Sequence, residues 1–154
     1  MHFDFVDAVL EISTERIVTL KNISAAEEYL QDHFPTFPVL PGVLMVESMV
    51  QAARRLLESR DASLGRYVLG GVRALKYGAL VRPGESMRLE VTLLKNEGDG
   101  YEFKGAGTVQ RPAGPSGNET VTCVSGRFNM RPVRLPGRQR HRTFAECNLP
   151  LKSP

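Results

Sequence analysis

The pattern of hydrophobic and polar positions changes near residue 66 of the 154-residue chain. Before that point, the apolar run over 41–58 repeats with a helical period and places hydrophobic residues on nearly every side, which is typical of a helix buried almost all round. Pro41 suits the first turn of this helix, because proline fixes φ and has no N–H. Polar residues gather in the second half, so we expect only that end to reach water.

Alternation of apolar and polar positions predicts strands over much of the remaining chain, most clearly at Met87, Leu89, Val91 and Leu93. The predicted strands are 5–12 and 16–20, which form a hairpin, and 67–77, 87–95, 101–110 and 119–130, whose short connections indicate an antiparallel meander. Ser24 followed by Glu27 has the spacing of a capping box and predicts a short helix to about Leu30.

One long apolar helix and about six strands can share a core only if the sheet curls around the helix. The sequence therefore predicts an α+β fold of the hotdog kind, a curled antiparallel sheet wrapped around one central helix. The length favours one domain over 1–130, and the Pro/Arg-rich composition beyond it indicates a basic C-terminal extension over 131–154.

The net charge of +3 is unevenly distributed. The extension holds six Lys and Arg residues and one Glu, a charge of +5, which leaves −2 for the rest of the chain. A basic tail of this kind is either a docking arm for an acidic partner or a solvated extension. We predict no nucleic-acid partner.

Several other classes of function are not indicated. No apolar stretch reaches the roughly 18–20 residues that cross a bilayer, and Asp4 and Asp7 interrupt the start where a secretory signal needs an apolar run, so we predict a cytoplasmic protein without a membrane span. Cys123 and Cys147 lack metal-ligand spacing and are expected to be reduced thiols without a role, and the three histidines are scattered. We predict no metal and no cofactor.

The segment 33–51, HFPTFPVLPGVLMVESMVQ, brings together candidate groups for acid–base chemistry. His33 precedes three prolines that stiffen the backbone, as a positioned base requires. Gly42 lies in the first helical turn, where free N–H groups and the helix dipole favour a ligand oxygen. Glu47 has apolar neighbours, whose desolvating effect is expected to raise its pKa and keep a proton available. Each residue alone has an ordinary structural explanation, and their conjunction favours an active site.

The pattern H-F-P-x-x-P-V-x-P-G-V-L-x-x-E-x-x-x-Q over 33–51 resembles the (3R)-hydroxyacyl-[acyl carrier protein] dehydratases of bacterial fatty-acid synthesis. Residues 72–94 resemble the strand, turn and following strand of the same family, and the resemblance covers roughly 5–130. Thr36 stands where the family usually has glycine, a change that could alter the loop beside the histidine.

The resemblance implies a role for each candidate. His33 would remove the C2 proton of a 3-hydroxyacyl thioester, the Gly42 N–H would bind the thioester oxygen, and Glu47 would protonate or orient the departing hydroxyl. Glu rather than Asp at position 47 implies dehydration without isomerisation. In the family the two side chains come from different subunits, which implies a homo-oligomer, either a dimer or a trimer of dimers.

A substrate tunnel is expected along the helix, and packing in the core is an equally good explanation for its predicted lining residues, Phe34, Phe37, Val39, Leu44 and Met45. Because the acyl carrier protein of the family is acidic, its docking candidates are the basic extension and Arg54, Arg55, Lys76, Arg82 and Arg88. Two alternatives stay open at this point: another hotdog enzyme such as a thioesterase, and a non-catalytic subunit that binds acyl thioesters.

Overall fold

The computed structural model describes residues 3–34, 36–61, 66–98, 100–112 and 117–133. In chain order the elements are β1 (Ala8–Ile12), β2 (Arg16–Asn22), the 3₁₀ turn η1 (Glu28–Leu30), α1 (Gly42–Arg60), β3 (Tyr67–Tyr77), β4 (Ser86–Glu97), β5 (Gly100–Pro112) and β6 (Asn118–Pro132). The strands form one six-stranded sheet in the order β1-β2-β4-β5-β6-β3.

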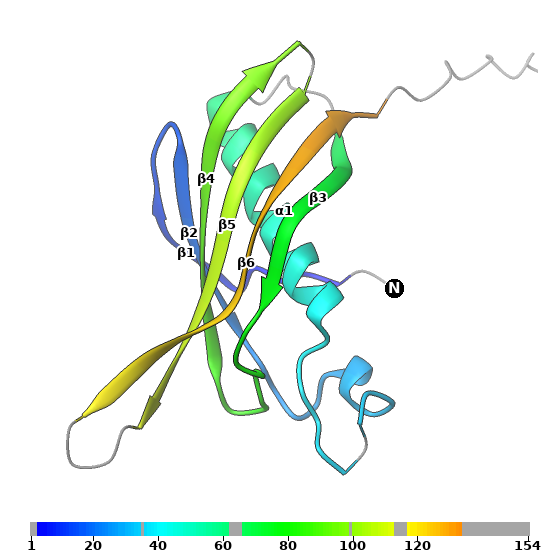
Figure 1. Cartoon of the computed structure of the whole chain (residues 1–154), viewed down its shortest axis with the longest axis vertical. Helices are drawn as coiled ribbons and strands as arrows, with labels where there is room; N and C mark the ends of the chain where they lie inside the picture. Colours follow the sequence, from blue (N-terminus) through cyan, green and yellow to red (C-terminus); the bar gives the residue numbers. More distant parts are fainter. Residues whose placement is uncertain (1–2, 35, 62–65, 99, 113–116, 134–154) are drawn as a thin grey trace, which may run out of the picture.

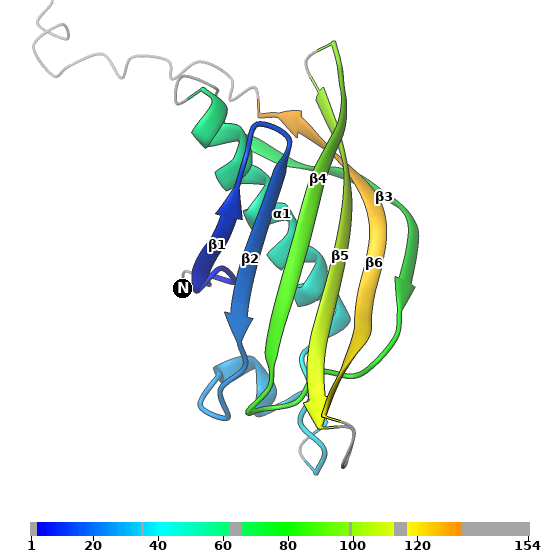
Figure 2. The ribbon, with the colours of Figure 1, turned by 90° about the vertical axis from the view of Figure 1, so that its left-hand side faces the viewer.

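Every pair of neighbouring strands is antiparallel, and α1 packs on one face of the sheet, which curls around it (Figures 1 and 2). This arrangement confirms the predicted α+β class with one central helix. The predicted meander is correct for β4, β5 and β6 and wrong for β3, which pairs with β6 at the far edge instead of with β4. The reason is that α1 carries the chain across the sheet between β2 and β3, and β4 then returns to pair with β2.

The core lies between α1 and the inner face of the sheet. The alternation predicted for β4 is confirmed, since Met87, Leu89 and Val91 are fully buried. Met49 of α1 lies directly over Gly105 of β5, where a β-carbon would collide with the Met49 sulfur. Small residues on the strands therefore allow the helix to approach the sheet closely.

The helix is less buried than its sequence suggests. Pro41 is its N-cap and Gly42 its first residue, and the helix runs to Arg60. Val43 is 71% exposed, so the prediction of nearly all-round burial is wrong for a single chain. The sheet covers one side of α1, and no described element covers the side that carries Val43.

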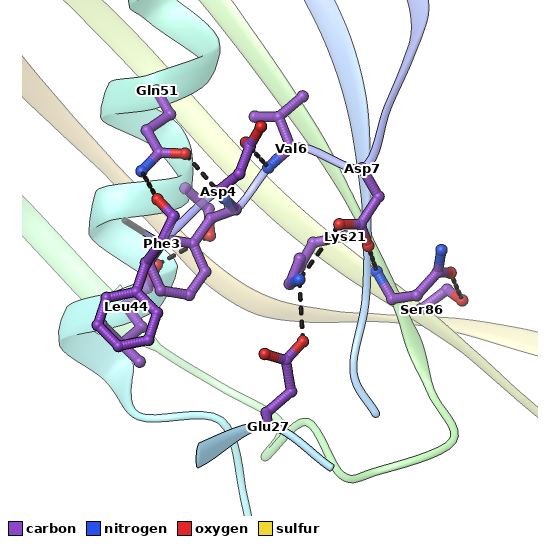
Figure 3. Close-up of polar contacts among 12 residues, drawn as sticks. Phe3, Asp4, Val6, Asp7, Lys21, Glu27, Leu44, Gln51 and Ser86 are labelled. Carbon is purple, nitrogen blue, oxygen red and sulfur yellow. Dashed lines mark hydrogen bonds and ion pairs between the residues drawn. The ribbon is translucent and has the colours of Figure 1, made fainter. Parts of the chain in front are cut away.

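The predicted helix after Ser24 is only the 3₁₀ turn η1. The Ser24 hydroxyl accepts the Ala26 N–H (3.2 Å), as in a turn. The Glu27 carboxylate does not return to cap the segment, because it binds Nζ of the buried Lys21 at 3.0 Å. Lys21 also binds Asp7 (3.2 Å), so that one lysine links β2 to the segments on either side of it (Figure 3).

The predicted division into a domain over 1–130 and a basic extension over 131–154 stays a prediction. Strand β6 continues to Pro132, and residues 134–154 of the basic extension lie outside the described residues. Within the described ranges, no helix combines the length and the apolar character needed to cross a membrane. A cytoplasmic location stays a prediction.

Candidate active site

His33 is half-buried in the loop that leads to α1, and one of its ring nitrogens is fixed. Nδ1 lies 2.9 Å from the carbonyl oxygen of Val39. A carbonyl only accepts hydrogen bonds, so the neutral imidazole must carry its proton on Nδ1 and keep a lone pair on Nε2. The loop itself thus sets the tautomer that a general base requires.

The residue after the histidine has an unusual backbone. Phe34 adopts a φ of 55°, in the left-handed region, and its carbonyl accepts the Phe37 N–H at 2.8 Å. Its ring meets the His33 ring edge-on, with centroids 4.6 Å apart. Such strain persists only where surrounding contacts enforce it. Here the strained residue, Phe34, packs its ring against the imidazole of His33.

Gly42 lies at the N-terminus of α1, where its N–H has no acceptor within the helix. The Tyr77 ring, from the end of β3, packs against this glycine, and a β-carbon at position 42 would lie 2.7 Å from Tyr77 Cε1. A larger residue at the helix tip would therefore displace the Tyr77 ring or the helix start, whereas glycine leaves the N–H open to a ligand oxygen.

These groups share one pocket with a volume of about 330 Å³. Its lining is almost entirely apolar apart from His33, and it is formed by the loop before α1, the first turns of α1, the end of β3 with residues 78–80, and Cys123 of β6. An apolar pocket with one imidazole and one helix N-terminus is suited to a hydrophobic ligand with a polarised carbonyl.

The tunnel residues predicted from the sequence divide into two groups. Phe34, Val39 and Met45 line the pocket. Phe37 lies outside it, with its ring under the Arg82 guanidinium (4.8 Å), and Leu44 packs against the core. Their placement differs because the loop turns at Phe34 and because Leu44 lies on a different side of the helix.

Sequence analysis missed Tyr77, Leu80 and Cys123, which also line the pocket. Cys123 was expected to have no role, but the alternation of β6 could have placed it on the core face. Burial raises the pKa of its thiol to about 11, so the thiol is neutral.

In the described part of the chain, no group of three or more His, Cys, Asp or Glu residues could hold a metal ion.

Glu47 is not one of the described residues that line the pocket. Its side chain is 37% exposed, and Oε1 accepts bonds from Gln51 Nε2 (3.1 Å) and from Arg54 Nη1 (3.4 Å). The expected desolvation of Glu47 is therefore wrong within one chain. The carboxylate lies on the side of α1 that the sheet leaves uncovered.

Gln51 connects Glu47 to the N-terminal segment of the chain. Its Oε1 accepts the Phe5 N–H (2.7 Å), and its Nε2 donates to the Phe3 carbonyl (3.0 Å) (Figure 3). The same Nε2 also donates to Glu47. These bonds fix the amide orientation. Gln51 consequently holds the carboxylate on the helix surface in a defined position.

Comparisons with known proteins show the family to which the chain belongs. Residues 10–113 match the family model described as ApeI-like, ApeI dehydratase. The chain is 35% identical over 126 residues to the 3-hydroxyacyl-[acyl-carrier-protein] dehydratase FabZ of Lactococcus lactis subsp. lactis, covering 81% of this chain and 86% of that protein. It is 35% identical over 108 residues to the protein of the same name from Petrotoga mobilis, covering 70% and 78%.

Solved structures show the same fold. A chain of the dehydratase heterocomplex ApeI:P from Xenorhabdus doucetiae superposes with a TM-score of 0.65 at 19% identity, over 85% of this chain and 84% of that chain. AziG from S. sahachiroi gives a TM-score of 0.60 at 13% identity, over 83% and 91%. The arrangement of helix and sheet is therefore the hotdog fold.

Proposed function

The chain belongs to the ApeI-like family of dehydratases, and on that premise we propose that it removes water from a (3R)-3-hydroxyacyl thioester carried on acyl carrier protein. The reaction breaks the C2–H and C3–O bonds and forms the C2=C3 double bond, so the products are the trans-2-enoyl thioester and water. The substrate belongs to fatty-acid synthesis or to a related lipid pathway.

The observation that carries this proposal is the hydrogen bond between Nδ1 of His33 and the Val39 carbonyl. It leaves Nε2 as the free basic nitrogen of a residue in an apolar pocket. In the proposed reaction Nε2 takes the C2 proton. That proton is acidic only if the developing enolate is stabilised, for which the Gly42 N–H at the helix tip is the proposed donor; one such donor typically contributes about 10² to 10³ in rate.

Glu47 is the proposed acid that gives a proton to the departing 3-hydroxyl. Gln51 and Arg54 both bind Oε1, so we assign Oε2 to the substrate. Because the pocket of the same chain does not include Glu47, the proposed site combines His33 of one subunit with Glu47 of a second copy. The exposure of Val43 beside Glu47, and the unpaired edge of β3, support a contact between two copies on this side.

The carrier protein is the proposed partner that delivers the substrate. Three of the candidate docking residues already form ion pairs with carboxylates of their own chain: Arg54, Arg55 and Arg88. Lys76 and Arg82 flank residues 77–80 of the pocket wall, and Arg82 lies over the Phe37 ring. We therefore favour Lys76 and Arg82 for docking.

The test replaces His33→Ala and Glu47→Gln separately and follows the absorbance of the enoyl product from a 3-hydroxyacyl thioester. Each change should lower kcat by about 10² or more, since general acid–base catalysis contributes roughly 10² to 10⁴. Glu58→Gln is the matched control, an exposed carboxylate on the same helix, and should leave kcat unchanged.

Near-normal turnover by either variant would mean that the roles are wrongly assigned. Release of free thiol without enoyl product would instead identify a thioesterase. Tight binding of an acyl thioester without turnover would identify a non-catalytic acyl-binding subunit.

A further inference from the structure

Residues 78–85 connect β3 to β4 and form one wall of the pocket through Gly78, Ala79 and Leu80. Two backbone bonds attach this wall to β6, from the Gly78 N–H to the Cys123 carbonyl (2.9 Å) and from the Ala79 N–H to the Thr122 carbonyl (3.0 Å). On the other side, the Val81 carbonyl accepts the Leu40 N–H (2.8 Å) of the loop before α1. The Leu80 carbonyl takes part in none of these backbone bonds and instead accepts a hydrogen bond from a side chain.

That side chain is Arg111, from the end of β5. Its Nη2 donates to the Leu80 carbonyl and to Glu85 Oε2 (3.2 Å), and its Nε donates to Glu85 Oε1 (2.8 Å). Glu85 Oε2 also accepts the Arg82 N–H (2.7 Å). One guanidinium thus joins the pocket side of the wall to the turn at its other end, with a forked geometry that lysine cannot reproduce.

The Arg111–Glu85 pair is more sheltered than the ion pairs on the outer face of the sheet. The Glu85 side chain is 19% exposed, against 54% for Glu11, which pairs with Arg16. Burial by itself would raise the pKa of the Glu85 carboxyl, but the hydrogen bonds from Arg111 and the Arg82 amide hold it below its ordinary value. The pair is therefore charged at neutral pH and less screened by solvent than its exposed counterparts.

We infer that Arg111 and Glu85 are positioning residues that fix the mouth of the acyl-thioester pocket by holding Leu80 in place. Leu80 and Phe34 are half or more exposed and form the rim, whereas Val39 and Cys123 are buried and form the interior. The pair therefore acts on the part of the substrate next to the carrier, not on the far end of the acyl chain. The inference rests on the proposed function for the identity of the ligand.

The experiment compares Arg111→Lys and Glu85→Gln with the wild-type chain, using N-acetylcysteamine thioesters of a short and a long 3-hydroxyacyl chain. These small substrates remove carrier docking from the measurement. KM should rise by about tenfold in each variant, the effect of losing one charge-assisted hydrogen bond, and by the same factor for both chain lengths, while kcat stays within about twofold. Because Arg111→Lys keeps the positive charge, a raised KM in this variant would identify the forked hydrogen-bond geometry of arginine as the cause.

Arg16→Lys is the matched control, since the Arg16 guanidinium also bridges two acceptor groups, the carboxylates of Glu11 and Glu90, but lies on the outer face of the sheet, and it should leave KM unchanged. A KM within about twofold of wild type in both pocket variants would overturn the inference, even if their melting temperatures fall, because the pair would then be only structural. If Glu85→Gln raises KM but Arg111→Lys does not, the positive charge is sufficient and the forked geometry of the guanidinium is not needed.

Calorimetric binding of a saturated acyl N-acetylcysteamine thioester gives the same comparison without turnover. If the wild-type chain binds this ligand but does not dehydrate the substrate, the proposed function fails. A tenfold weaker Kd in both pocket variants would still support the positioning role, and an unchanged Kd would overturn it.

Discussion

Gly42 satisfies a steric and a chemical requirement at the same position. The Tyr77 ring occupies the space that a β-carbon would need, and the N–H at the helix tip has no acceptor in the helix. The sequence indicated the second requirement from the Pro-Gly pair at the helix start. It could not indicate the first, because contact with Tyr77 depends on where β3 lies in the sheet.

Gly42→Ala is expected to displace the Tyr77 ring or the helix tip and to lower kcat by about tenfold or more, since small shifts of a catalytic group are costly. The control is Tyr77→Phe, which keeps the ring that meets Gly42 and loses only the hydroxyl, and it should stay close to wild type. Steady-state kinetics of both variants give the comparison. Normal kcat in Gly42→Ala would contradict the role of the helix tip.

The buried thiol of Cys123 should make stability depend on alkaline pH. Burial raises its pKa from 9.0 to about 11, so the folded state disfavours the thiolate. The resulting stability is fully present below pH 9 and is lost as the pH rises toward 11. The free energy of unfolding of wild type, relative to Cys123→Ala, should therefore fall by about 2 kcal/mol between pH 8 and 11. A difference that does not change with pH would contradict this burial.

Among the elements, α1 and β5 pack closely because a large side chain on the helix lies opposite a glycine on the strand. Met49 fills the space above Gly105. This contact limits how closely the helix can approach the sheet, four residues after Met45, which lines the pocket.

Gly105→Ala should destabilise the fold by about 1–3 kcal/mol through overpacking, and Met49→Ala by about 2–5 kcal/mol through a cavity. In the double variant the new methyl group enters the space that Met49 leaves, so the loss should be smaller than the sum of the two. Urea denaturation of the four proteins measures this coupling. Simple additivity would contradict the direct contact.

The boundaries of most elements were predictable because local patterns determine them. The predicted strand over 67–77 and β3 coincide, and α1 differs from its prediction by a residue or two. The position of β3 at the far edge was not predictable, since alternation gives the faces of a strand but not its neighbours. Glu27 shows a related limit, because its bond to Lys21 overrides the local capping pattern.

For the whole molecule, the stretch 33–51 singled out in the sequence supplies part of the lining of the candidate pocket but not its complete geometry. The motif placed His33 and Gly42 correctly near each other, because they flank one short loop. The wall formed by Tyr77, Leu80 and Cys123 comes from segments distant in sequence and could not be inferred from local patterns. The exposure of Glu47 has the same origin, since it depends on which side of α1 the sheet covers.

In the proposed mechanism, His33 of one chain and Glu47 of a second copy together dehydrate the substrate. The most direct measurement mixes the inactive His33→Ala and Glu47→Gln proteins, lets their subunits exchange, and follows enoyl thioester formation. In a two-fold dimer, half of the dimers become mixed and each has one intact site, so activity should return to about a quarter of wild type. A mixture that stays inactive after subunit exchange has been verified, or appreciable activity of either variant alone, would contradict the account.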